Sequence, residues 1–162
     1  GYFYDMPIGR MFICEDGTGI NEVTLIKNEN EDYYTKNYVI QETELLKKAA
    51  TQLREYFEGK RKEFNICLNP KGTPFQKKVW DALLKIPYGE TRSYKDIAIA
   101  VGNPNACRAV GMANHKNPIM CIIPCHRVIG SDGSLTGYGG GIEIKEKLLT
   151  LEKIHYGKEE NL

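Results

Sequence analysis

Histidine, paired cysteines and long apolar runs are scarce in this chain. Its 162 residues include three histidines, His115, His126 and His155, and no Cys-x-x-Cys pair. A structural zinc site needs several His or Cys ligands at close, regular spacing. A membrane span needs roughly 18 consecutive apolar residues, and no run approaches that length. The sequence therefore argues against a fold stabilised by structural zinc and against a transmembrane protein. We expect no metal and no cofactor.

The cysteines favour a reducing compartment. Their number is odd, which does not fit a framework of disulfides. The first ten residues contain neither a basic segment nor an apolar core, so no secretory signal peptide is expected. We therefore expect a cytoplasmic protein with five free thiols, at Cys14, Cys67, Cys107, Cys121 and Cys125.

Charge is unevenly distributed along the chain, although the net charge is only +1. Residues 1–68 hold 9 Lys and Arg against 12 Asp and Glu, whereas residues 69–157 hold 12 against 7. A positive excess in one half points to an anionic partner for that half. A solvated surface of chance composition gives the same count, so charge alone leaves both readings open.

Residues 1–68 predict a small α+β domain. Apolar runs at 11–14 and 23–27, joined by the turn signal Asp-Gly-Thr-Gly, are typical of a β-hairpin. Aromatic and β-branched residues at 33–41 favour a third strand or an irregular loop.

A helix is expected next, because apolar residues recur at helical spacing over 42–58. Thr43 is placed to cap its start and Gly59 to end it. The apolar residues at 64–68 then predict a last strand. This half contains no group of residues with an evident chemical role.

The second domain, residues 69–162, is expected to be mainly helical. Thr73 and Pro74 are typical of a helix start, and Ser93 with Asp96 matches a capping box at the start of the next helix. A further helix follows the Gly-Asn-Pro turn and covers about 105–114. Two short helices joined by such a turn suggest a helix-turn-helix.

The second of these two helices is unusual for a reader of the major groove. It offers Arg108 as its one long polar side chain among small residues, including Ala106, Ala109 and Gly111. Small residues let a helix approach another surface closely. Such a helix either packs tightly in a core or presses into a groove with Arg108 as an inserted probe.

The segment Pro124-Cys125-His126-Arg127 places a thiol, an imidazole and a guanidinium together. A reactive cysteine needs a nearby cation or base, and a base is commonly oriented by a carboxylate. Glu143 and Glu152 are the downstream candidates for that carboxylate. A buried free cysteine with only a packing role is the alternative.

A glycine-rich loop at 137–141 contains one aromatic residue, Tyr138. Glycines let a ligand come close to the backbone. The loop lacks the G-x-x-x-x-G-K-S/T pattern of a phosphate-binding loop. A flat aromatic ligand stacked near Tyr138 fits this composition better than a phosphate.

Pro124-Cys125-His126-Arg127-Val128 resembles the active-site signature of the O6-alkylguanine-DNA alkyltransferases, which are single-use DNA repair proteins. The stretches GTPFQKKVWDALLKIPYGETRSYKDIA, GNPNACRAVGMANHKNPI and GYGGGIEIKEKLLTLE are also similar, in the same order and approximate spacing. The likeness is close over about 69–155 and only general over 1–68. It implies an α+β fold, with a ribonuclease H-like N-terminal lobe and a winged-helix-like helix-turn-helix in the C-terminal lobe.

The resemblance implies a role for individual residues in alkyl transfer. Cys125 corresponds to the alkyl acceptor, His126 to its base acting through a water, and Glu152 to the carboxylate that orients the imidazole. Asn117 corresponds to a residue that braces the active-site turn. Tyr94 corresponds to the residue that acts on the target's phosphate and donates to the departing guanine.

The resemblance also implies how DNA is bound. Arg108 takes the place of the extruded base, with DNA contacts from Tyr94, Ala106, Ala109, Gly111 and Arg127. The guanine pocket is expected to be lined by Tyr138, Val128, Ser134, Gly139 and Gly140. The partner is double-stranded DNA carrying O6-alkylguanine, bound in the minor groove by a monomer with little dependence on sequence. Residues 112–115 are less typical of the family, so the resemblance leaves their contacts undefined.

Three other functions are weighed against alkyl transfer. A non-catalytic sensor of alkylated DNA has the same DNA-binding frame but lacks the acceptor, so Cys125 argues against it. A redox-sensing regulator needs more base-reading side chains than Arg108. A cysteine hydrolase using Cys125 and His126 would turn over repeatedly, whereas alkyl transfer stops after one event.

Overall fold

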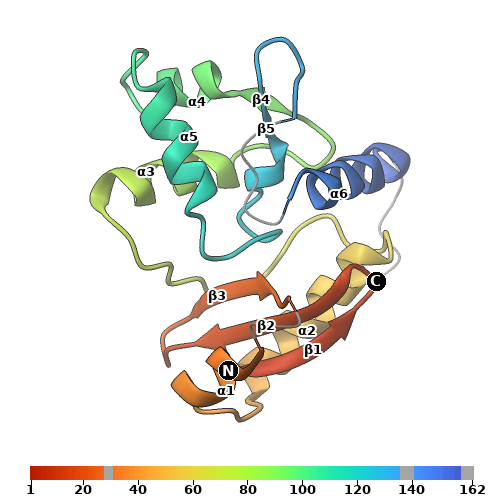
Figure 1. Ribbon diagram of the computed structural model, residues 1–162. Helices are drawn as coiled ribbons and strands as arrows, with labels where there is room; N and C mark the ends of the chain where they lie inside the picture. Colours follow the sequence, from red (N-terminus) through yellow and green to blue (C-terminus); the bar gives the residue numbers. More distant parts are fainter. Residues whose placement is uncertain (28–30, 136–140, 158–162) are drawn as a thin grey trace. The chain divides into compact units, whose positions relative to one another are not determined.

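The computed structural model describes residues 1–27, 31–135 and 141–157 (Figure 1). The chain divides into two compact units, an N-terminal unit of Gly1–Pro70 and a C-terminal unit that begins at Lys71. Within the described residues, no helix has the length and apolar character needed to cross a bilayer. Each unit has its own core and is described in turn.

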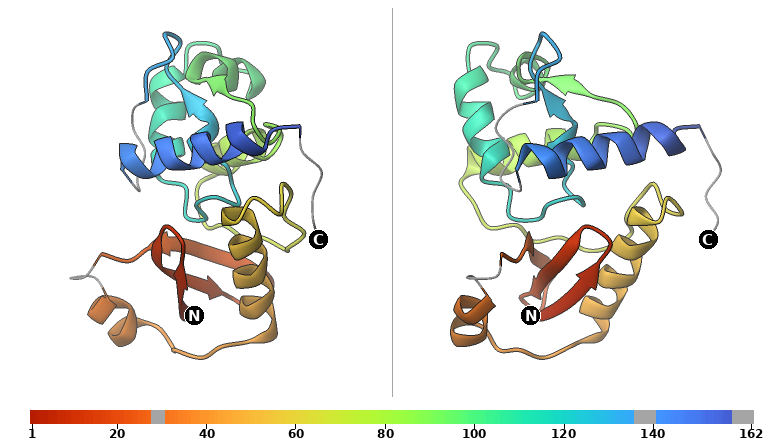
Figure 2. Two further views of the ribbon diagram at one scale, coloured as in Figure 1. Left: turned by 90° about the vertical axis from the view of Figure 1, so that its right-hand side faces the viewer. Right: turned by 45° about the vertical axis from the view of Figure 1, so that its right-hand side comes forward.

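The N-terminal unit is built on a three-stranded antiparallel sheet with the order β1-β2-β3. The strands are β1 (Tyr2–Met6), β2 (Gly9–Glu15) and β3 (Ile20–Leu25). Helix α2 (Glu44–Phe57) packs against this sheet, as both views in Figure 2 show. The predicted hairpin is therefore confirmed as β2 and β3.

The predicted helix is confirmed as α2. Thr43 caps it, because its hydroxyl accepts a hydrogen bond from the Leu46 N–H. Gly59 follows the helix with a φ of 76°, the left-handed conformation that favours glycine.

Strand β2 forms the centre of the N-terminal core. Its consecutive residues Met11, Phe12 and Ile13 are all fully buried. Consecutive residues of a strand point to opposite faces, so both faces of β2 are covered. The rings of Tyr34 and Tyr38 pack on Phe12, with centroid distances of 4.6 and 5.0 Å.

The prediction of a strand or loop at 33–41 was wrong, because helix α1 (Glu31–Asn37) covers most of it. The aromatic residues that suggested a strand instead cover Phe12 from outside the sheet. Local bonds support the helix: the Thr35 hydroxyl donates to the Glu31 carbonyl, and the Asn37 amide donates to the Tyr33 carbonyl.

The strand predicted at 64–68 was also wrong, since only Leu68 forms a single bridge, to Ile20. The backbone of Asn65 bonds instead to the side chain of Gln52 on α2, through N–H to Oε1 at 2.9 Å and carbonyl to Nε2 at 3.3 Å. Strand β1 had no counterpart among the predicted elements.

The C-terminal unit is mainly helical. Its helices are joined by a two-stranded parallel sheet of β4 and β5 and by one 3-10 turn, η2. The elements are α3 (Pro74–Leu84), β4 (Arg92–Ser93), α4 (Tyr94–Ala100), α5 (Cys107–His115), η2 (Cys125–Arg127), β5 (Val128–Ile129) and α6 (Ile142–His155). The overall α+β class with a helical C-terminal part is thus confirmed.

Capping explains where α3 and α4 begin. Thr73 and Gln76 form one capping box, and Ser93 and Asp96 form the second, as the sequence predicted for the latter. Helices α4 and α5 pack on each other across the Gly102 turn and also against α3. The α4–turn–α5 arrangement is the predicted helix-turn-helix.

Trp80 ties α3 to α5. Its side chain is 1% exposed, and its Nε1–H donates to the Ala113 carbonyl at 2.9 Å. We expect Trp80→Phe to destabilise the protein by about 2–4 kcal/mol, because it opens a cavity and leaves a buried carbonyl without its donor. Urea unfolding measures this, with the exposed Ile99→Ala as a control expected to stay within about 0.5 kcal/mol of the parent. Equal stability of the two variants would contradict the role of Trp80.

Candidate active site

The cysteine segment runs through the interior of the C-terminal unit. Ile122, Ile123 and Pro124 are buried and lead into η2, whose residues Cys125, His126 and Arg127 are 4%, 0% and 6% exposed. The Cys125 N–H donates to the Ile123 carbonyl at 2.8 Å, so the chain turns sharply at the thiol. A reactive group in such a turn is shielded from bulk water.

Asn117 holds the turn before the thiol. Its side-chain amide donates to the Ile123 carbonyl at 2.9 Å and to the Ile119 carbonyl at 3.3 Å. Its Oδ1 accepts from the Ile119 N–H at 3.0 Å. These bonds fix the backbone path that leads to Cys125.

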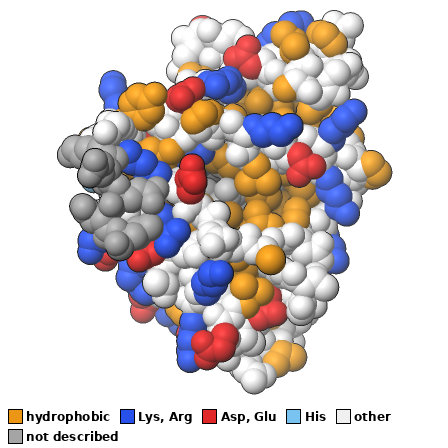
Figure 3. Space-filling model, turned by 180° about the vertical axis from the view of Figure 1, so that it is seen from behind, with side chains coloured by type: hydrophobic (Ala, Val, Ile, Leu, Met, Phe, Trp, Pro, Cys, Tyr) orange, Lys and Arg blue, Asp and Glu red, His pale blue; other side chains and the backbone are white. Residues whose placement is uncertain are grey.

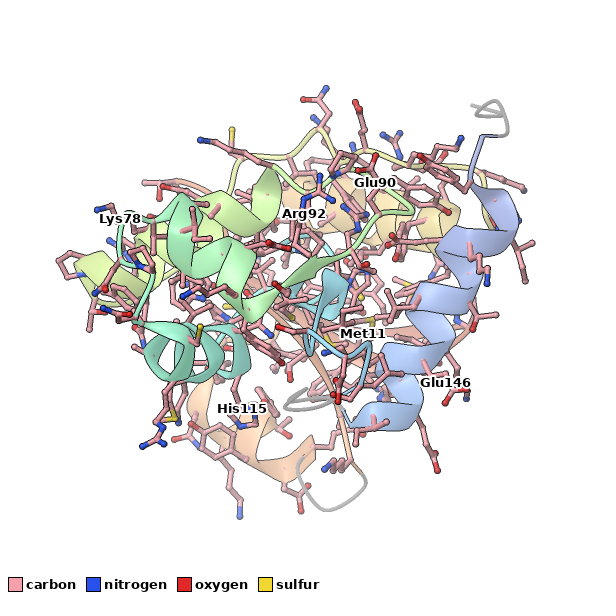
Figure 4. The ribbon with its side chains drawn as sticks, turned by 90° about the horizontal axis from the view of Figure 1, so that it is seen from above. Met11, Lys78, Glu90, Arg92, His115 and Glu146 are labelled. Carbon is pink, nitrogen blue, oxygen red and sulfur yellow. The ribbon has the colours of Figure 1, made fainter. Side chains whose placement is uncertain are left out.

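Glu152 on α6 gathers the polar groups around η2. Its carboxylate accepts from His126 Nε2 at 2.6 Å, and from Arg127 Nε at 2.8 Å and Arg127 Nη2 at 3.0 Å. The Gly89 N–H, from the turn after α3, adds a bond of 2.9 Å. Glu152 is 1% exposed, so a buried charge is satisfied by these donors. Glu143, the other candidate, is exposed at the start of α6, and Glu146 also lies on the outer side of that helix (Figure 4).

The electrostatics favour a neutral histidine beside an ionised glutamate. Burial lowers the pKa of His126, outweighing the hydrogen bond and charge of Glu152, which raise it. Burial also acts to raise the pKa of Glu152, but bonds and charge from His126 and Arg127 outweigh it and lower that pKa to about 2. An imidazole with its proton on Nε2, facing the carboxylate, has its acceptor lone pair on Nδ1.

Helix α5 presents a second group of residues. Val110, Ala113 and Asn114 are buried, whereas Arg108 and Ala109 are exposed on the other side. Gly111 lies next to the ring of Tyr94, whose carbon atoms are 3.9 Å from the position that a Cβ on this glycine would take. Arg108, Ala109, Gly111 and Tyr94 thus share one region of the surface, as a groove-binding helix requires.

Comparison with known proteins identifies the family. Residues 2–70 match the model of the 6-O-methylguanine DNA methyltransferase ribonuclease-like domain, and residues 74–154 match that of the DNA-binding domain. The chain belongs to the 6-O-methylguanine DNA methyltransferase family. Among its relatives is the methylated-DNA–protein-cysteine methyltransferase of Methanosarcina barkeri, 49% identical over 93% of this chain and 97% of the relative. The constitutive enzyme of Bacillus subtilis is 49% identical over 94% of each chain.

Solved structures agree with this assignment. The O6-methylguanine methyltransferase of Mycobacterium tuberculosis superposes with a TM-score of 0.88 at 45% identity, over 98% of this chain and 94% of that one. The same organism's protein in complex with DNA gives a TM-score of 0.86 at 45% identity, over 95% and 92% of the two chains. The fold class and the family resemblance predicted from the sequence are therefore confirmed.

Two of the residues expected to contact DNA are not at the surface. Arg127 is buried, bonded to Glu152 and to the Ile86 carbonyl through Nη1 at 2.7 Å, and lies 5.6 Å from the centre of the Tyr88 ring. The predicted DNA contact of Arg127 was therefore wrong, and its guanidinium instead holds the carboxylate of Glu152 in place. Ala106, the residue before α5, is 9% exposed, so most of its surface is covered by protein rather than open to DNA.

Three polar contacts at the site were missed in the sequence. Asn114, on the buried side of α5, donates to the Cys125 carbonyl at 3.3 Å. Lys145 is completely buried and donates from Nζ to the Val128 carbonyl at 2.5 Å. Burial lowers the pKa of its ammonium group, and the nearby Cys125 acts in the opposite direction. Gly89, to which the sequence assigned no role at the site, supplies its N–H to Glu152. Lys145, Leu148 and Glu152 recur at helical spacing, and that pattern was the available signal.

A second thiol, that of Cys121, lies close to Cys125. Cys121 is 1% exposed, and burial followed by the proximity of Cys125 raises the pKa of its thiol well above the ordinary value. It also has a φ of 69°, a conformation that a residue with a Cβ rarely adopts. Cys121 therefore stays a protonated thiol, whereas Cys125 has the hydrogen-bonded pair of His126 and Glu152 beside it.

The expected guanine pocket is described only in part. Val128 is buried and follows η2 directly. Ser134 is exposed and closes a turn, because its carbonyl accepts from the Gly130 N–H at 2.8 Å. Tyr138, Gly139 and Gly140 lie outside the described residues.

The depressed pKa of Glu152 links stability to pH. The unfolded chain takes up a proton near pH 4.5 and the folded protein near pH 2. The contribution of this carboxylate is therefore complete above about pH 4.5 and is lost as the pH falls toward 2, by up to about 3 kcal/mol. Urea unfolding at several pH values should show a steeper acid decline for the parent than for Glu152→Gln. The exposed Glu143→Gln should follow the parent, and parallel curves for all three proteins would contradict the assignment.

Proposed function

We propose that this protein is a single-use DNA repair protein that removes alkyl groups from O6 of guanine. It binds duplex DNA, turns the damaged nucleotide out of the helix and transfers the alkyl group to Sγ of Cys125. The observation that carries the proposal is the bond of 2.6 Å between Glu152 and His126, directly beside a buried cysteine. The proposed acceptor Cys125, its base His126 and the orienting carboxylate of Glu152 thus lie together in one buried cluster.

The proposed chemistry is a nucleophilic substitution at the alkyl carbon. Neutral His126 accepts the thiol proton through an intervening water, and Glu152 stabilises the imidazolium that forms. The thiolate forms a bond to the alkyl carbon while the bond from that carbon to O6 breaks. The electron pair of the broken C–O6 bond stays with the guanine, which takes a proton from the Tyr94 hydroxyl. The product is a thioether that water does not readily cleave, so each molecule acts once.

Base flipping explains the character of α5. A base inside a duplex cannot present its O6 substituent to a buried thiol, and extruding it costs a few kcal/mol of stacking. Arg108 fills the vacated place, and Ala109 and Gly111 let the helix lie deep in the minor groove. The complex of the Mycobacterium tuberculosis relative with DNA supports DNA as the partner.

A modest charge suits a protein whose DNA binding depends little on sequence. Figure 3 shows lysine and arginine side chains scattered among acidic ones on the face seen from behind, rather than gathered in one field. Binding by shape and backbone contacts needs no base-reading patch. We further propose that residues 69–162 carry DNA binding and alkyl transfer as a monomer without a cofactor, while residues 1–68 form a supporting domain.

Incubation of the protein with duplex DNA carrying one O6-methylguanine tests the reaction. Peptide mass mapping should find one methyl group per protein, on the Cys125 peptide. Cys125→Ser should still bind the duplex but remove no methyl group, and the control Cys67→Ser, at an exposed thiol of the N-terminal unit, should react like the parent. A parent protein that binds the lesion with Cys125 unmodified would favour the sensor, and a second turnover would favour a hydrolase.

Loss of the inserted arginine should affect only substrates that must be flipped. We expect Arg108→Ala to slow transfer from duplex DNA by about tenfold to a hundredfold, in line with a few kcal/mol of flipping cost. Its reaction with free O6-benzylguanine should change far less. Single-turnover rates on both substrates measure this, with the exposed cation variant Lys147→Ala as the control. Equal losses on both substrates would remove Arg108 from the flipping step.

A further inference from the structure

The exposed face of α5 carries one side chain that the proposed mechanism does not use. Met112 is 62% exposed, which makes it the most exposed large apolar side chain among the described residues of the C-terminal unit. Single exposed apolar residues are ordinary on protein surfaces. The place of Met112 on the helix gives it significance, because it stands four residues after Arg108.

The packing of α5 fixes which residues face outward. Val110, Ala113 and Asn114 are buried, and the Ala113 carbonyl is bonded to Trp80. Residues four apart in a helix lie on the same face, one turn from each other. Arg108 and Met112 therefore project side by side.

On α5 itself, small and basic residues surround this pair. Ala109 and Gly111 add almost no bulk between the two long side chains, and the Tyr94 ring lies next to Gly111. His115 and Lys116 continue the exposed face at the end of the helix, where Figure 4 labels His115. Helix α5 has no acidic residue. Met112 is thus the one large apolar group on a face otherwise suited to a polyanion.

We infer that Met112 is a second side chain inserted into the minor groove, and that it makes repair depend on the base pairs flanking the lesion. The inference rests on the proposed function, because it needs α5 in that groove. Proteins that bind the minor groove commonly use apolar wedges such as Met beside cationic side chains. The flexible thioether chain of methionine adapts to an irregular surface at small cost.

The preference follows from the chemistry of the groove floor. An A·T pair presents only acceptors there, whereas a G·C pair adds the 2-amino donor of guanine. The sulfur of Met112 is a weak acceptor, so an apolar chain pressed on that amino group leaves it without a good partner. Lesions flanked by A·T pairs should therefore be repaired faster than lesions flanked by G·C pairs.

The test uses three duplexes that differ only in the pairs beside O6-methylguanine: A·T, G·C and inosine·C. Inosine lacks the 2-amino group, so inosine·C keeps the major-groove face of G·C and two of its three pairing hydrogen bonds, but not the minor-groove donor. The parent should react about threefold to tenfold faster with A·T and inosine·C flanks than with G·C flanks, as loss of one buried hydrogen-bond partner predicts. Met112→Ala should react at similar rates with all three.

Ile99→Ala is the matched control, since Ile99 is a comparably exposed apolar residue, 55% exposed, on the neighbouring helix α4. It should keep the flank dependence of the parent. The same flank dependence in Met112→Ala and the parent, or a parent that does not distinguish inosine·C from G·C, would overturn the inference. Failure of the proposed function looks different, because the parent would then form no thioether at Cys125 with any duplex.

Discussion

The C-terminal unit depends on one buried carboxylate, that of Glu152. Its four hydrogen bonds come from the turn after α3 and from two residues of η2, so one side chain of α6 joins three segments far apart in the sequence. A buried charge is tolerable only while its partners stay in place, and removal of one partner costs several kcal/mol. The contact that orients the proposed base is therefore also one that the fold needs, and the catalytic arrangement is largely preorganised by folding.

Local signals account for the elements that the sequence predicted well. Caps and turn residues marked α3, α4 and the end of α2, because their hydrogen bonds lie within a few residues of each other. The failures share a different origin. The aromatic residues of α1 cover Phe12. Residues near Asn65 do not join the sheet, because the backbone of Asn65 is hydrogen-bonded to the side chain of Gln52. Neither contact can be read from neighbouring residues.

The candidate site divides in the same way. The cysteine signature and the family resemblance led to Cys125, His126 and Glu152, and these three residues lie together. The prediction for Arg127 was wrong, because a long cationic side chain next to two candidate catalytic residues resembles a DNA contact until its burial is known. Lys145 was overlooked because a lysine side chain is ordinarily solvent-exposed. Only the packing of α6 against η2 shows that one face of that helix carries two buried charges of opposite sign.

The two-residue ladder of β4 and β5 has a mechanical meaning. It pairs Arg92 with Val128 and Ser93 with Ile129, so it lies directly before Tyr94 in one strand and three residues after Cys125 in the other. Tyr94, proposed to contact the DNA, and Cys125, proposed to accept the alkyl group, are thus held in place by the same pair of hydrogen-bonded strands. The distance over which a flipped nucleotide must move from the DNA to the thiol is then set by the fold. Selectivity among lesions therefore depends on which nucleotides can span that distance.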